Sequence, residues 1–143
     1  MIATETVSVL NRLLHVLCRS LPMYLAEARP WSRPEHRAAQ KALDLLVADR
    51  HDDAMRVAEA IVERGGHPDP GVFPIEFSAM NDLAMDFLLR KVLEGQHADI
   101  AAIRQCAAEL AGEPPLQELA EEILGNAKGH AEILGEIAGR EGD

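Results

Sequence analysis

The chain has 143 residues, a formal net charge of -10, 48% hydrophobic residues and only 3% aromatic residues. The length predicts a single domain over residues 1–143. Apolar content carried mainly by Ala, Leu, Ile and Val, together with abundant Glu and Arg, favours helices over strands. The negative charge argues against nucleic acid or an anionic membrane as a partner. No apolar run is long enough to span a bilayer, and two isolated cysteines favour the reducing cytoplasm as the location.

The first half of the chain predicts two long helices. The first begins near Thr4 or Thr6, and Pro22 predicts a kink inside it because proline removes a backbone donor. Ser32 and Glu35 have the spacing of a capping box, so the second helix is predicted over residues 33–64. It should end at Gly65–Gly66, because glycine is favoured past a helix end.

The second half predicts two more helices after an irregular stretch. Residues 66–77, "GHPDPGVFPIEF", contain three prolines and two glycines. The third helix is predicted over residues 78–111, and the fourth begins at Pro115 or Leu116 and should fray through glycines near its end. The joins between helices one and two and between three and four are short, whereas the join between two and three is long. An all-α four-helix bundle with one long crossover follows from this pattern.

Three segments resemble bacterioferritin and its ferritin-like relatives. They are "NRLLHVLCRSLPMYLAEAR" at 11–29, "RHDDAMRVAEAIVERGGHPD" at 50–69 and "LAEEILGNAKGHAEILGEI" at 119–137. The resemblance implies a ferritin-like bundle whose crossover joins helices two and three. In such bundles a di-iron centre takes one glutamate from each of two helices and a Glu-x-x-His motif from each of the other two.

Mapped onto this family, the chain keeps both histidines, His51 and His130, but loses carboxylates. Leu17 falls on the helix-one glutamate, and Ala48 and Ala127 fall on the glutamates of the two Glu-x-x-His motifs. The resemblance therefore implies a degenerate di-iron site, with hydrocarbon at the centre of the bundle and no ferroxidase chemistry.

The fourth carboxylate position is Glu94 on gapless spacing, while Leu93 fits the apolar phase better. A displaced site built from His51, His130 and either Glu94 or Asp44 is the alternative, and it would suit iron or zinc. Against it, core histidines that hydrogen-bond a neighbour are commoner than new metal sites.

The expected function is that of a structural or interaction module with no cofactor and no established enzymatic activity. The alternatives are a metal-binding protein or oxidoreductase with a remodelled site, and a small-molecule binder with a cavity left by the lost glutamates. A homo-oligomer, dimeric or larger, is expected. Phe73, Ile75 and Phe77 in the crossover are expected to cover a partner helix.

Overall fold

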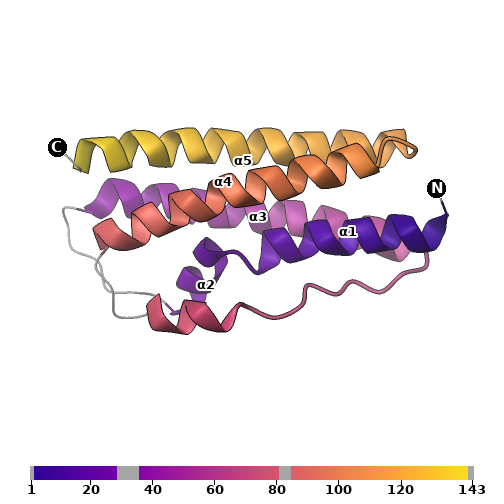
Figure 1. The fold of residues 1–143 in the computed structure, drawn as a ribbon, viewed down its shortest axis with the longest axis horizontal. Helices are drawn as coiled ribbons and strands as arrows, with labels where there is room; N and C mark the ends of the chain where they lie inside the picture. The colour runs from indigo at the N-terminus through magenta and orange to yellow at the C-terminus, as the bar shows by residue number, and fades with distance from the viewer. Residues whose placement is uncertain (1, 29–35, 81–84, 142–143) are drawn as a thin grey trace.

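The computed structural model describes residues 2–28, 36–80 and 85–141 (Figure 1). Its elements are α1 (Ala3–Cys18), α2 (Leu21–Ala28), α3 (Arg37–Glu63), the 3-10 helix η2 (Ile75–Met80), α4 (Met85–Glu109) and α5 (Pro114–Glu141). The predicted capping box at Ser32 and Glu35 lies outside the described residues. Within the described part of the chain, no helix is long and apolar enough to cross a membrane.

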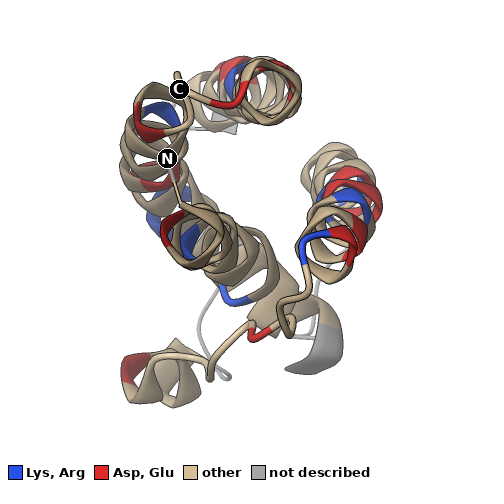
Figure 2. Ribbon diagram, turned by 90° about the vertical axis from the view of Figure 1, so that its right-hand side faces the viewer, with Lys and Arg blue, Asp and Glu red and all other residues tan. Residues whose placement is uncertain are grey.

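The four long helices α1, α3, α4 and α5 lie side by side along the length of the molecule. Helices α3 and α4 run in the same direction, and α1 and α5 run in the opposite one (Figure 1). The chain between α3 and α4 therefore travels back along the whole bundle, below the helices in the end-on view (Figure 2). The predicted all-α four-helix bundle with one long crossover between its second and third long helices is confirmed.

The predicted kink near Pro22 is present as a break between α1 and α2. Helix α1 ends at Cys18, and α2 begins at Leu21. Proline has no N–H to donate to the carbonyl four residues earlier, which is that of Cys18. The guanidinium of Arg19 donates to this carbonyl instead, at 3.4 Å.

The end of α3 is the predicted glycine stop. Gly65 has a φ of 76°, and its N–H donates to the carbonyl of Val62 at 2.9 Å. The N–H of Gly66 donates to the carbonyl of Ile61 at 3.0 Å. This pair of bonds is the Schellman motif, which satisfies carbonyls that the helix leaves open.

Two predicted helix bounds in the second half are wrong. Residues 75–80 form the 3-10 helix η2, so the third long helix begins at Met85 and not at Ser78. The last helix does not fray at Gly135 and Gly139 but continues to Glu141. Leu134 and Ile137 are buried in the core, and this packing outweighs the low helix propensity of glycine.

The crossover is attached to one face of α1. The side chains of Asn11, His15 and Arg19 recur every four residues and so lie on one face of the helix. The Asn11 amide donates to the carbonyl of His67 at 3.2 Å, His15 Nδ1 lies 2.8 Å from the carbonyl oxygen of Pro70, and Arg19 Nε donates to that of Gly71 at 2.8 Å. Side chains of α1 thus hydrogen-bond to backbone carbonyls of the crossover, which has no regular secondary structure there.

The aromatic residues of the crossover pack within the chain. The rings of Phe73 and Phe77 lie 5.4 and 5.7 Å from the ring of Tyr24 in α2, and the guanidinium of Arg19 lies over Phe73. Phe73 and Phe77 stay partly exposed, so the expectation that they cover a partner helix remains a prediction. Ile75 is different, because 84% of it is exposed.

Buried apolar residues form two separate clusters along the bundle. The first joins α1 with the second half of α3, the second half of α4 and the first half of α5. The second joins α2 with the first half of α3, the first half of α4 and the end of α5. Between the two clusters the interior is polar.

Candidate functional site

A buried arginine lies in the polar layer between the two apolar clusters. The side chain of Arg50, on α3, is only 4% exposed. Its Nη1 donates to Asp99 Oδ2 at 3.0 Å and to the carbonyl of Val16 at 3.3 Å, and its Nη2 donates to Gln96 Oε1 at 2.7 Å. Gln96 in turn donates to the carbonyl of Ala127 at 3.1 Å. These bonds connect all four long helices at one level, and we call Arg50, Gln96 and Asp99 the polar layer.

The main electrostatic interaction of the polar layer is the ion pair between buried Arg50 and partly buried Asp99, whose side chains are 4% and 21% exposed. Burial raises the pKa of Asp99 above its ordinary value, and the adjacent guanidinium of Arg50 partly offsets that rise. An arginine side chain stays protonated at any physiological pH. The layer therefore holds a permanent positive charge with one carboxylate as its partner.

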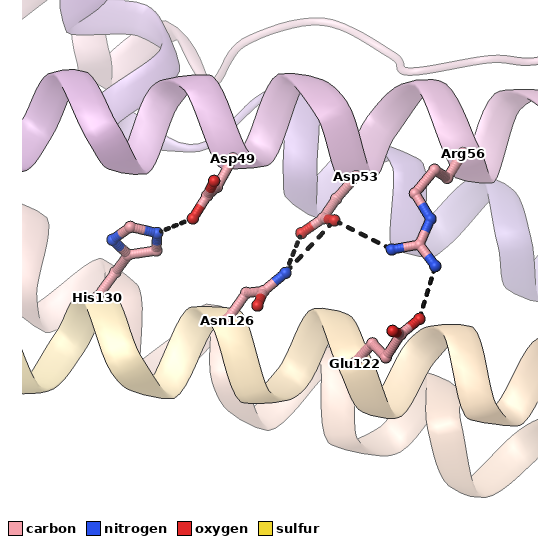
Figure 3. Close-up of polar contacts among 6 residues, drawn as sticks. All are labelled: Asp49, Asp53, Arg56, Glu122, Asn126 and His130. Atoms are coloured by element: carbon pink, nitrogen blue, oxygen red, sulfur yellow. Dashed lines mark hydrogen bonds and ion pairs between the residues drawn. The ribbon is translucent and has the colours of Figure 1, made fainter.

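A second row of polar contacts joins α3 to α5 (Figure 3). His130 Nε2 lies 2.6 Å from Asp49 Oδ2. One turn further on, the Asn126 amide donates to Asp53 at 3.1 Å, and one turn beyond that Arg56 pairs with Glu122 at 2.6 Å. These contacts cross between two helices whose polar residues face each other, so the row fixes the register of α3 against α5.

Asp53 is the buried member of this row, at 5% exposure. Burial raises its pKa, while the hydrogen bond from Asn126 and the charge of Arg56 lower it by less.

The structure does not bring the predicted ligands together. His51 is exposed on the outer side of α3. His130 is half-buried and bonded to Asp49. Glu94 is exposed on α4, where it pairs with Lys91 at 3.4 Å. In the part of the chain that the structure describes, no group of three or more His, Cys, Asp or Glu side chains could hold a metal ion.

The three residues predicted to replace iron ligands have different fates. Leu17 and Ala127 are buried, at 1% and 5% exposure, as expected. Ala48 is exposed, so the expectation that it lies at the centre of the bundle is wrong. The inward face of α3 passes through Leu46, Arg50 and Asp53, and Ala48 lies on the opposite side of the helix.

Arg50 and Asp99 were missed by the reasoning from sequence. An arginine in a helix is normally exposed to solvent. The burial of Arg50 can be predicted only from its position among the apolar residues of α3. The usable signal was periodicity, because Leu43, Leu46, Arg50, Ala54 and Val57 recur at intervals of three and four.

The interior of this bundle does not suit a di-iron centre. Such a centre requires several carboxylates and imidazoles that face one another across the helices. Here the polar layer offers one carboxylate and one amide, and a guanidinium already occupies both. A metal cation would have to displace a fixed positive charge.

The arrangement defines a class of fold. Two antiparallel helix pairs joined by one long crossover, with polar groups halfway along the interior, form a ferritin-like bundle. Among solved structures, the chain is similar to that of a ferritin-like, diiron-carboxylate protein from Bacillus anthracis str. Ames. The similarity covers 95% of this chain and 96% of the other, with a TM-score of 0.79 and 17% sequence identity. At that identity the likeness establishes the fold. No protein-family model matches the chain, and no curated protein matches it.

Proposed function

We propose that this protein is a single-domain ferritin-like module without ferroxidase activity, located in the cytoplasm, that acts through self-association or contact with another protein. The observation that carries the proposal is the bonding of Arg50 in the polar layer. A guanidinium held by Asp99 and Gln96 provides, within the bundle, the positive charge that buried carboxylates need. The free thiols of Cys18 and Cys106 agree with a reducing compartment.

Such a module would act by holding its helices in a fixed arrangement. The polar layer links four helices through directional bonds between the two apolar clusters, and Arg50 and Gln96 in it are buried. The module therefore presents rigid outer helix faces whose spacing does not depend on a bound ion.

The experiment is a metal analysis of protein purified from cells grown with added iron and zinc. We expect substoichiometric iron and zinc in the wild type, with the same amounts in His51→Ala and His130→Ala. We also expect the rate of Fe(II) oxidation to match that of buffer alone.

The alternative, a remodelled iron or zinc site that uses His51 and His130, has one favourable contact, the short distance between His130 and Asp49. Stoichiometric metal that is lost in either histidine variant would establish that alternative and overturn the proposal.

A further inference from the structure

A cavity of about 450 Å³ lies at the break between α1 and α2. Its walls come from residues within 15–21 around the break, within 74–80 of the crossover and within 91–99 of α4. Helix η2 lies beside α2 in this region (Figure 1). Sites for small molecules usually have volumes of roughly 300–1,000 Å³, so the cavity is large enough to hold one.

Two local features of the sequence create this space. Helix α1 ends at Cys18 and α2 begins only at Leu21, because Pro22 interrupts the helix. On the facing side, α4 places Gly95 at the wall, and a Cβ added there would have no atom within 4 Å of it. Glycine inside a helix is destabilising relative to alanine. Here the missing side chain keeps the cavity open.

Most of the wall is apolar. Val16 from α1, Leu21 from α2 and Phe77 from η2 line the cavity together with Pro74 and Met80. Leu21 is buried, and Val16 and Phe77 are partly buried. Walls of this kind, with a few polar groups placed among apolar ones, bind ligands that have an apolar body.

Ser20 brings to the cavity a hydroxyl that the fold leaves unpaired. The residue is 6% exposed and lines the cavity, and its Oγ has no hydrogen-bond partner among the described residues. Its carbonyl accepts from the N–H of Tyr24 at 3.2 Å, so Ser20 stands where a serine ordinarily caps a helix, yet its side chain makes no capping bond. A buried hydroxyl without a partner is unfavourable, so a ligand atom that accepts from it would be stabilised.

Arg19 supplies a positive charge that no carboxylate balances. The other charged groups at the wall are paired. Lys91 lies 3.4 Å from Glu94, and Asp99 lies 3.0 Å from Arg50. Arg19 donates to two backbone carbonyls, and within the described part of the chain it pairs with no carboxylate. A planar guanidinium is well suited to bind a carboxylate.

We propose that the cavity at the α1–α2 break binds a small carboxylic acid with an apolar body. The carboxylate accepts from Ser20 and Arg19, and the body packs against the apolar wall. One negative charge on the ligand matches the one unbalanced positive charge at the site. The inference goes beyond the proposed function, and it requires neither a metal nor self-association.

The first test is a calorimetric titration of the full chain with octanoate, octylamine and 1-octanol. The three probes share an apolar chain and differ in the head group. We expect octanoate to bind one site per chain with a Kd below about 1 mM. Octylamine and 1-octanol should bind at least about tenfold more weakly, because the first is repelled by Arg19 and the second cannot pair with its charge. Arg19→Gln should weaken octanoate about tenfold and leave 1-octanol unchanged.

The second test fills the cavity. Gly95→Leu places a side chain in the empty space and should weaken octanoate binding about tenfold or more, while leucine favours the helix more than glycine does. Gly125→Leu is the matched control. Gly125 is exposed on α5 and also has open space around it, so this variant should bind octanoate as the wild type does.

The third test removes the unpaired hydroxyl. Ser20→Ala should weaken octanoate binding about threefold or more, because the carboxylate loses a donor. The midpoint of urea unfolding without ligand should stay the same or rise, since the hydroxyl has no bond to lose in the free chain. A lower midpoint with unchanged binding would assign Ser20 a structural role and overturn its part in the site.

The remaining outcomes decide the site and its ligand. Failure of octanoate to bind, or equal binding by Gly95→Leu and the wild type, overturns the site. Octylamine that binds as tightly as octanoate overturns the carboxylate as the ligand. None of these results changes the expected metal content, so the proposed function is tested separately by the metal analysis.

Discussion

At the scale of single residues, the buried side chain of Arg50 is the main polar feature of the bundle interior. Its guanidinium is removed from water and bonded to Asp99, Gln96 and a backbone carbonyl. Desolvation makes such an ion pair costly to form and still more costly to break, because removal of one partner leaves a buried charge alone.

We predict that Asp99→Asn lowers the free energy of unfolding by about 2–4 kcal/mol at neutral pH, since it leaves Arg50 charged without a carboxylate. Urea denaturation followed by circular dichroism measures the change. Glu94→Gln is the matched control on the same helix; its carboxylate is exposed, so the expected change is below about 0.5 kcal/mol. Equal effects of the two changes would contradict a special role for the polar layer.

The raised pKa of Asp53 predicts how the free energy of unfolding depends on pH. Its pKa is raised in the folded state, chiefly by burial. While the pH rises from the ordinary aspartate value to this raised value, the folded chain binds more protons at Asp53 than the unfolded chain does. The contribution of the group to stability is therefore greatest at the acidic end and decreases as pH rises.

The measurement compares the unfolding free energy of the wild type with that of Asp53→Asn across this pH window. The wild type minus variant difference should decline with rising pH and become constant above the folded pKa. A difference that grows with pH would show that the pKa of Asp53 is lowered in the folded state.

At the scale of elements, the crossover depends on α1 for its path. Gly71 has a φ of 73°, and a Cβ there would lie 2.7 Å from His15 Nδ1. Gly65 has a similar φ of 76° but open space around it. A substitution at Gly65 therefore tests backbone strain alone, whereas one at Gly71 tests strain together with a steric clash.

We predict that Gly65→Ala costs about 1 kcal/mol, from the positive φ alone. Gly71→Ala should cost about 2–3 kcal/mol, because the added methyl also displaces His15 from the carbonyl of Pro70. Thermal and urea unfolding of both variants measure the costs. Equal costs would mean that the bond between His15 and the crossover contributes little.

At the scale of the whole molecule, two apolar clusters and the polar layer divide the interior along its length. The four long helices, their antiparallel pairing, the Pro22 break and the Gly65 stop follow from local patterns, and the structure has them. The candidate site was less predictable. The family resemblance placed Ala48 inside, whereas the packing of α3 places Arg50 there.

The sequence by itself determined the four long helices and their order, because helix periodicity, proline and glycine act within a few residues of the chain. It also determined the topology, since one join alone was long enough to traverse the bundle. Only the tertiary structure decided which face of α3 is buried. A rotation of a helix by one residue is about 100°, and that rotation is set by contacts with α1, α4 and α5. The same rotation that buries Arg50 beside Asp99 exposes Ala48 and His51.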